Sequence, residues 1–255
     1  MADAVYAVKI PLSAADAWTG TLAFTWQILF DFAGYSTIAI GVAMLFGFAL
    51  PRNFHWPYAA SGFSEFWRRW HISLSSWLRD YLYIPLGGNR GSKFAIYRNL
   101  ALTMLLGGLW HGAAWTFVFW GGLHGVFLIA ERLVRQYSPK IDKLIEKGWA
   151  IPLTFPLVCL TWVFFRAGSF SQAGSILSSM FGVQAGSRVL TNADIATMVL
   201  ITSVGFGVSI LFRRLTMEQV WSRVPRPLAA IMILAMTLLV FLSPGDNRAF
   251  IYFRF

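Results

Sequence analysis

Five long apolar stretches dominate this sequence and limit the folds that it can adopt. They cover residues 21–50, 99–130, 149–165, 195–212 and 228–242. Several of them approach the roughly 20 residues that an α-helix needs to cross the hydrocarbon core of a bilayer. Only 13% of the residues are charged, whereas soluble domains carry about a quarter. The sequence therefore predicts an all-α, polytopic integral membrane helical bundle, with residues 1–255 forming a single membrane domain.

The positive charge lies in the connections between these stretches. The formal charge is +10, and Lys and Arg concentrate in residues 52–98, 131–147 and 213–226. Basic connections are typical of the cytoplasmic side of membrane proteins, so we expect these three inside and both termini outside. The same distribution argues against nucleic-acid binding, which requires a basic patch on one face. The first 20 residues lack the pattern of a signal peptide.

Residues 64–83 are predicted to form an amphipathic helix at the membrane surface. At 100° per residue, one face is apolar and the other is polar and basic. The apolar face holds Trp67, Trp70, Leu74, Trp77, Leu78 and Tyr81, and the polar face holds Arg68, Arg69, His71, Ser73, Ser75, Ser76, Arg79 and Asp80. The segment GGNRGSK (residues 87–93) follows, and its spacing does not fit a P-loop. We interpret it as a basic cytoplasmic turn, with a weak contact to a cofactor's phosphates as the alternative.

The stretch 99–130 is too long for one straight span, and glycines interrupt it. These are Gly107, Gly108, Gly112, Gly121, Gly122 and Gly125. We predict two short helices or a re-entrant pair, with an even number of crossings. Broken backbone at membrane depth has to be covered by protein or by a water-filled cavity.

Chemistry in this chain has to rely on its four histidines. No group of Cys, His and carboxylates has metal-ligand spacing, so we predict no metal site. His111 lies inside an apolar stretch, where an ionisable side chain is by default a functional-site hypothesis. A neutral imidazole can remove a proton from a hydroxyl that attacks a thioester. The alternative is a buried histidine that joins two helices by hydrogen bonding.

Other polar residues in or near the apolar stretches have structural interpretations. On helical pattern alone, His71 belongs to a solvated basic face. His124 is expected to pack, His55 is expected to have no role in the site, and the single cysteine, Cys159, is expected to be a buried hydrophobic residue. Asp31 is expected to face the bundle interior as a structural hydrogen-bonding residue, with a place in a polar path as the alternative.

Two long motifs resemble the membrane-bound O-acyltransferase family. They are FWRRWHISLSSWLRDYLYIPLGGNR (residues 66–90) and LLGGLWHGAAWTFVFWGGLHG (residues 105–125). The branch resembled contains the bacterial alginate O-acetyltransferase membrane subunit and its peptidoglycan-acetylating relatives and, more distantly, the membrane protein of teichoic-acid D-alanylation. The closing segment FIYFRF (residues 250–255) also resembles that branch.

The resemblance implies a site and an activity. The histidine of the GLWHG motif, His111, is implied as the catalytic residue, and that of the RRWHISLS motif, His71, as a second functional histidine. A tunnel through the membrane is implied, and we expect it to be lined by Trp110, Arg68, Ser75, Arg79, Asp80 and Asp31. The expected activity is O-acetylation of an extracytoplasmic polysaccharide, of alginate or peptidoglycan type, in the bacterial cytoplasmic (inner) membrane. Acetyl-CoA or another acyl thioester is the expected donor substrate, with no bound cofactor and with a periplasmic acetyltransferase as partner.

The chain departs from this branch in two ways. The run DFAGYST carries Thr37 where the branch usually has an acid. The match also corresponds only to the C-terminal half of the family's fold, so we expect a separate chain to supply the N-terminal spans. The alternatives are a D-alanyl transferase of the same family and a non-catalytic, truncated membrane scaffold.

Overall fold

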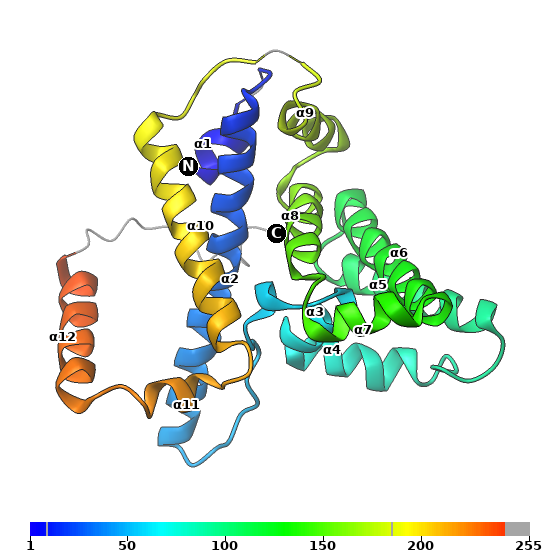
Figure 1. Ribbon diagram of the computed structural model, residues 1–255, viewed down its shortest axis with the longest axis horizontal. Coiled ribbons are helices and arrows are strands. Elements are labelled where there is room, and N and C mark those ends of the chain that lie inside the picture. Colours follow the sequence, from blue (N-terminus) through cyan, green and yellow to red (C-terminus); the bar gives the residue numbers. More distant parts are fainter. Residues whose placement is uncertain (9, 185, 243–255) are drawn as a thin grey trace.

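The computed structural model describes residues 1–8, 10–184 and 186–242, and the closing FIYFRF segment lies outside these ranges. Within them the chain is helical, and the only β-type pairing is an isolated bridge between Leu12 and Ser187, which confirms the all-α prediction. The helices are α1 (Ala2–Tyr6), α2 (Ala14–Leu45), η1 (Pro57–Ala59), α3 (Phe63–Arg69), α4 (Ile72–Leu78), η2 (Arg79–Tyr83), α5 (Lys93–Trp110), α6 (Trp115–Tyr137), α7 (Pro139–Lys147), α8 (Ile151–Arg166), α9 (Phe170–Met180), α10 (Asn192–Phe212), α11 (Met217–Trp221) and α12 (Arg226–Leu242) (Figure 1).

Three of these helices are long and apolar enough to cross a membrane. They are α2, α6 and α10, and the pair α7–α8, bent by 82°, is a fourth candidate if it forms one broken span. α12 is a shorter apolar helix. The chain is therefore a membrane protein, as its apolar stretches predict. Helices α7 and α9 were not predicted separately.

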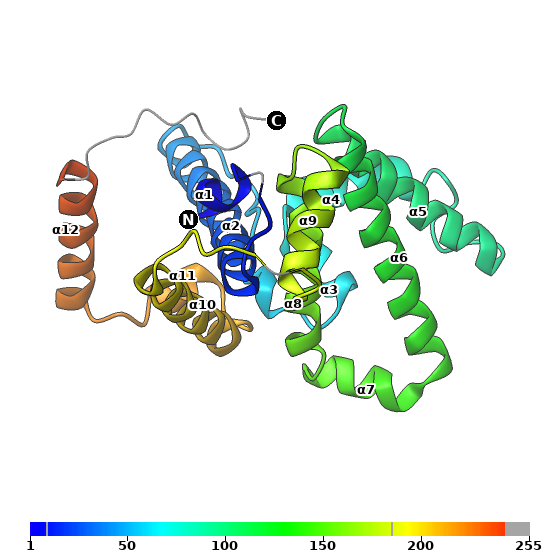
Figure 2. The same ribbon diagram turned by 90° about the horizontal axis from the view of Figure 1, so that it is seen from above.

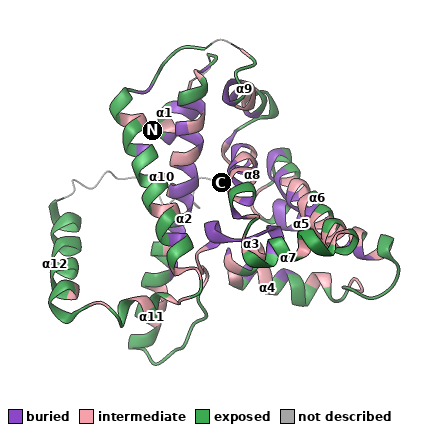
Figure 3. Ribbon diagram, in the orientation of Figure 1, coloured by how far each residue is buried: buried purple, intermediate pink, exposed green. Residues whose placement is uncertain are grey.

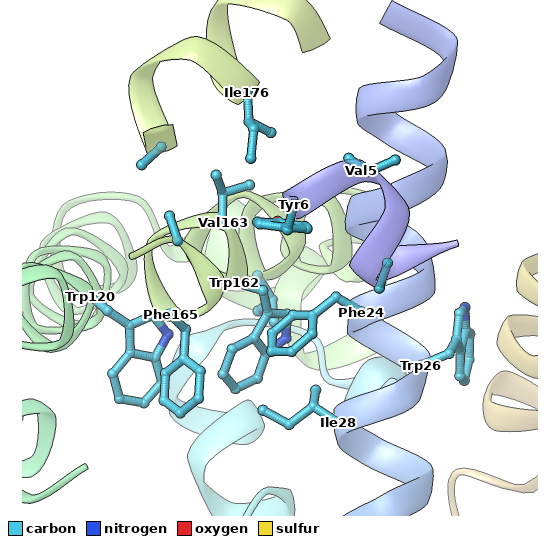
Figure 4. Packing of buried hydrophobic residues seen from close by; sticks show 14 of the residues in the cluster. Val5, Tyr6, Phe24, Trp26, Ile28, Trp120, Trp162, Val163, Phe165 and Ile176 are labelled. Atoms are coloured by element: carbon cyan, nitrogen blue, oxygen red, sulfur yellow. The ribbon is translucent and has the colours of Figure 1, made fainter. Parts of the chain in front are cut away.

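The core forms where α2 packs against α8 and α10. Phe24 of α2 is fully buried and lies near Trp162 and Phe165 of α8, in a cluster dominated by aromatic side chains (Figure 4). Trp26, on another face of α2, donates its indole N–H to the hydroxyl of Thr202 on α10 over 3.1 Å. Large rings bury much apolar area for each residue that is ordered, and they stabilise this junction.

The N-terminal segment closes one end of the core. Helix α1 lies along α2. Val5 of α1 is fully buried and faces Gly20 of α2. Asp3 forms an ion pair of 2.7 Å with Arg166 at the end of α8, and the N–H of Leu12 donates to the hydroxyl of Ser179 on α9. The beginning of the chain is therefore fastened to segments more than 160 positions later.

Helices α5 and α6 form a hairpin, which confirms the prediction of two helices in the glycine-rich stretch. They cross with Gly108 and Gly121 face to face. A Cβ added to Gly121 would lie 3.1 Å from the Cα of Gly108 and closer still to the carbonyl oxygen of Met104. Small residues allow such close backbone approach between helices in membranes.

The prediction of one amphipathic helix over residues 64–83 is wrong. α3 ends at Arg69, the chain kinks at Trp70 and His71, and α4 is followed by the π-helical turn η2. The apolar face is also divided. Trp70 is buried, whereas Tyr81 of η2 is 70% exposed, because the break changes the direction of the chain.

Large apolar surfaces remain uncovered in the described part of the chain. α12 has no buried residue, and the two ribbon views show it standing apart from the other helices (Figures 1 and 2). α10 and the C-terminal half of α2 are exposed along much of their length (Figure 3). Such surfaces are typical of contacts with lipid or with other membrane helices.

Candidate functional site

His111 lies at the tip of the α5–α6 hairpin. It directly follows α5, and its backbone N–H donates to the carbonyl of Gly108 over 3.1 Å. Three aromatic rings stand steeply inclined to its imidazole, with centroid distances of 5.0 Å to Trp110, 5.3 Å to Trp120 and 5.2 Å to Phe165. The ring is therefore held in a largely aromatic environment, which limits the access of bulk water to a proton-transferring group.

His71 lies at the break between α3 and α4, with a left-handed φ of 42°. This conformation costs a non-glycine residue on the order of 1 kcal/mol or more. Asn53 stabilises the left-handed backbone at His71 through the two residues that follow it. The backbone carbonyl of Asn53 accepts the N–H of Ile72, and the side-chain oxygen of Asn53 accepts the N–H and the hydroxyl of Ser73. The kink turns the imidazole inward, where it is 8% exposed and packs edge-on against Phe32 at 4.7 Å. The solvated position favoured by the helical pattern is therefore wrong.

The ring of Trp110 contacts both histidines. Its centroid lies 5.0 Å from that of His111 and 6.1 Å from that of His71. The structure thus brings together the two histidines and the tryptophan that the motifs single out, from segments 40 positions apart in the sequence (111 − 71).

The other predicted tunnel residues have partners elsewhere. The hydroxyl of Ser75 donates to the carbonyl of Trp70 over 2.9 Å and supports the break in the helix. Arg79 and Asp80 form an exposed ion pair of 2.7 Å on η2. Asp31 is exposed on α2 among the described residues, and its expected position in the interior of a complete bundle stays a prediction. The lining of a tunnel by these residues stays a prediction.

The remaining histidines have structural positions. His124 is fully buried, and its Nε2 lies 3.0 Å from the hydroxyl of Thr161. Since that hydroxyl donates to the carbonyl of Val158, Nε2 is the donor to Thr161. His55 lies 3.2 Å from the carbonyl of Leu215 in a connection outside the hairpin. Cys159 is fully buried, as expected. Groups of three or more His, Cys, Asp or Glu suited to a metal ion do not occur in the described ranges.

A polar cavity of about 460 Å³ lies between α3, α6 and α7. Charges of both signs line it, and its lining is Ser61, Ser64, Glu65, Arg68, Arg135, Ile145, Glu146 and Arg213. Arg68, one of the predicted tunnel residues, is thus placed at a cavity. It lies three positions before His71, so α3 connects the cavity with the break that carries this histidine.

Two carboxylates that the sequence did not single out hold α3 beside this cavity. Glu131 of α6 accepts the N–H of Ser64 over 3.0 Å and forms an ion pair of 2.8 Å with Arg135. Its side chain is 7% exposed, and it caps the first turn of α3 from a different helix. Gly62, with φ +108°, makes room for it, because a Cβ there would lie 2.8 Å from the carboxylate.

Glu65 is the second of these carboxylates. Burial raises its pKa, but hydrogen bonds from the Ser61 N–H and Arg69, together with the charges of Arg69 and Arg213, outweigh burial and leave the pKa below its ordinary value. The carboxylate is therefore ionised at neutral pH. The i, i+4 spacing of Glu65 and Arg69 is visible in the sequence and suggests an ion pair, but it does not reveal that the pair is largely buried.

Comparison with known proteins adds family information to this geometry. The model of the membrane-bound O-acyltransferase family matches residues 6–167, a range that includes both His71 and His111. The probable alginate O-acetylase AlgI of Azotobacter vinelandii is 48% identical over 207 residues, which cover 78% of this chain and 40% of that protein.

Two further relatives carry different names. The peptidoglycan O-acetyltransferase of Helicobacter pylori is 46% identical over 68% of this chain and 33% of its own length. The teichoic acid D-alanyltransferase of Bacillus subtilis is 32% identical over 58% of this chain and 40% of its own length. The chain thus spans less than half the length of each of these three relatives.

Proposed function

The chain belongs to the membrane-bound O-acyltransferase family, and on this premise we propose that residues 1–255 form the C-terminal half of an enzyme that acetylates an extracytoplasmic polysaccharide. The observation that supports the proposal most strongly is the convergence of His71 and His111 on Trp110. Two ionisable side chains from separate segments meet in an apolar surrounding, where such a side chain is by default a functional-site hypothesis.

In this proposal His111 is the general base. The hydroxyl of the acceptor gives its proton to the neutral imidazole while its oxygen attacks the carbonyl carbon of an acyl thioester. The C–S bond then breaks, the ester remains on the acceptor, and the proton passes from the imidazolium to the departing thiolate. General-base assistance of this kind contributes about 10² to 10⁴-fold to the rate. The rings around His111 reduce the competing attack of water on the thioester.

His71 is proposed as the second functional residue. It shares the Trp110 ring with His111, and Asn53 fixes the backbone that carries it. A polar group in this position is suited to orient the acceptor hydroxyl or the thioester, and orientation of reactants contributes to the rate without bond making by the orienting residue.

The donor substrate is proposed to be acetyl-CoA or another acyl thioester. The polar cavity beside α3 offers Arg68 and Arg213 to the phosphates of such a donor, and arginine binds phosphate through paired N–H groups. Arg68 in the lining of this cavity lies on α3, which ends next to His71.

Further spans and partners complete the proposal. The exposed apolar surfaces of α2, α10 and α12 are suited to pack against membrane helices that this sequence does not contain. We expect a periplasmic acetyltransferase to receive the acetyl group and the whole assembly to lie in the bacterial inner membrane. D-alanyl transfer is the alternative activity, and the lower identity to the D-alanyltransferase disfavours it.

Substitution of the histidines tests the proposal in cells that supply the complementary spans and the polymer. His111→Gln should reduce ester formation by about 10² to 10⁴-fold, and His71→Ala should leave partial activity. His55→Gln is the matched control and should retain activity. Alkaline release from the polymer, followed by quantification of acetate and D-alanine, identifies the acyl group. Full ester content in His111→Gln at normal membrane abundance would refute the general-base role of His111 and would favour the non-catalytic scaffold.

A further inference from the structure

A basic cleft of about 440 Å³ opens at the far end of the α5–α6 hairpin from His111. Its lining is Lys93, Ile96 and Tyr97 of α5 with Arg132, Arg135 and Gln136 of α6. Three of these six residues are cations, and none of the six is acidic. The cleft lies where the apolar sequence of α6 gives way to a charged one, which is the position of a membrane–water interface.

Two of the three cations, Lys93 and Arg132, have no acidic partner among the described residues. Arg135 is neutralised by Glu131 and Asp142. Arg132, in contrast, donates to the neutral side-chain oxygen of Asn89 over 2.7 Å. Lys93 lies 5.4 Å above the ring of Tyr137. Within the described ranges, the observed partners of Lys93 and Arg132 are thus uncharged, and the cleft has a net positive charge.

The buried hydroxyl of Tyr97 is a second unusual feature of this cleft. Its oxygen is shielded from solvent and has no hydrogen-bond partner among the described residues. A buried polar atom without a partner costs about 1–3 kcal/mol. Because this oxygen is shielded, the contacts with a ligand are assigned to Lys93 and Arg132 and not to the Tyr97 hydroxyl.

An apolar groove of about 440 Å³ continues along the same two helices. Its walls include Ala101 and Leu105 of α5 and Gly122, Val126 and Ile129 of α6. The residues of the two cavities follow one another at helical spacing, with 93, 97, 101 and 105 on α5 and with 132, 129, 126 and 122 on α6. Residues three and four apart occupy the same side of a helix, so cleft and groove form one path with a cationic end and an apolar remainder.

From this path we infer that the α5–α6 hairpin binds an anionic phospholipid. The phosphate of the headgroup occupies the basic cleft between Lys93 and Arg132, and one acyl chain follows the groove past Gly122. Basic pockets between helices at the membrane surface are suited to anionic headgroups. The site is distinct from the histidine pair, and the inference does not rest on the proposed acyl transfer.

The apolar groove favours a lipid over a soluble phosphate. A free phosphate would use the cations but would leave the groove empty, whereas a phospholipid satisfies both parts. Gly122 lies in the wall of this groove, and the nearest atom to a Cβ added there is the flexible end of the Leu105 side chain, at 3.3 Å.

Lipid titration of the purified full chain in mild detergent tests the inference. Native mass spectrometry would count bound dioleoyl phosphatidylglycerol and dioleoyl phosphatidylcholine, which share acyl chains and differ in net charge. The double substitution Lys93→Gln with Arg132→Gln should weaken phosphatidylglycerol binding by roughly 10- to 30-fold, since each cation near the membrane surface contributes comparably. Lys140→Gln with Lys143→Gln on α7 removes the same charge from exposed positions and should change binding by less than about 2-fold.

Two further arms distinguish the source of the phosphate and the role of the groove. Inorganic phosphate at the same concentration should neither compete nor raise the thermal midpoint. Gly122→Leu should weaken binding of the lipid. Val126→Trp adds a large ring to the groove wall from an exposed position and provides the same test if Gly122→Leu fails to fold. Equal losses in the cleft and α7 double variants, equal binding of the two lipids, or full protection by inorganic phosphate would each overturn the inference.

Discussion

The crossing of α5 and α6 at Gly121 provides a sharp test of how the fold positions His111. In Gly121→Ala, the new methyl group would lie 3.1 Å from both the Cα and the N of Gly108 and closer still to the carbonyl oxygen of Met104. These are backbone atoms, so no side-chain rotation can relieve the contact. The two helices have to separate by at least several tenths of an ångström, and the turn that carries His111 moves with them.

The expected cost can be estimated from that geometry. Overpacking by one methyl group in a close contact destabilises a protein by about 1–3 kcal/mol, which corresponds to a fall in thermal midpoint of about 2–12 °C for a chain of this size. A shift of about 1 Å at a catalytic group can also reduce the rate by about 10²-fold.

Gly122→Ala is the matched control. Its added methyl group would meet only the flexible end of Leu105, at 3.3 Å. Thermal midpoints in detergent and ester formation in the complemented cells should therefore differ between the two variants, with Gly121→Ala lower in both. Equal midpoints and equal activities would refute the argument that the Gly108–Gly121 contact sets the position of His111.

Three other outcomes are expected. Cysteines introduced at Gly91 and Lys143 should be shielded from impermeant thiol reagents outside intact cells, because basic connections stay in the cytoplasm; labelling of both from outside would invert the topology. The chain expressed alone should show no acyl transfer, since the exposed surfaces of α2, α10 and α12 leave the bundle open; turnover by the purified single chain would contradict this. The lowered pKa of Glu65 means that its stabilising contribution is complete above the ordinary glutamate value of 4.5 and is lost as the pH falls through the lower folded value. The difference in thermal midpoint between the native chain and Glu65→Gln should therefore be constant above about pH 5 and should shrink as the pH falls below about 4.5. A difference that stays constant on this acidification would be inconsistent with an ionised Glu65.

The helical hairpin and the membrane spans could be predicted because their signals are local. Apolar length predicts α2 and α10, and the glycines around His111 predict a break between two helices. The pairing of His111 with His71 came from the family resemblance, since nothing in the spacing of two residues 40 positions apart indicates contact. Their approach depends on how α3, α4 and the hairpin pack.

The kink at His71 could not be predicted from helical periodicity. Residues 64–83 have a continuous amphipathic pattern, yet Asn53, well before the segment, supplies the hydrogen bonds that stabilise a left-handed residue there. A tertiary contact has overridden local propensity. For the same reason the sequence did not reveal Glu131 as a cap for α3, because a helix cap is normally sought in the adjoining residues.

The cap that Glu131 places on α3 has a consequence for biosynthesis. Ser64 and the carboxylate that accepts its N–H are 67 positions apart, so α3 leaves the ribosome long before its cap is made. Contacts of high sequence separation form late, because the intervening chain has to be ordered first. The attachment of α3 to the hairpin is therefore expected to form only after Glu131 of α6 has been made, and a nascent chain halted before Glu131 would contain every residue of the RRWHISLS motif without this attachment.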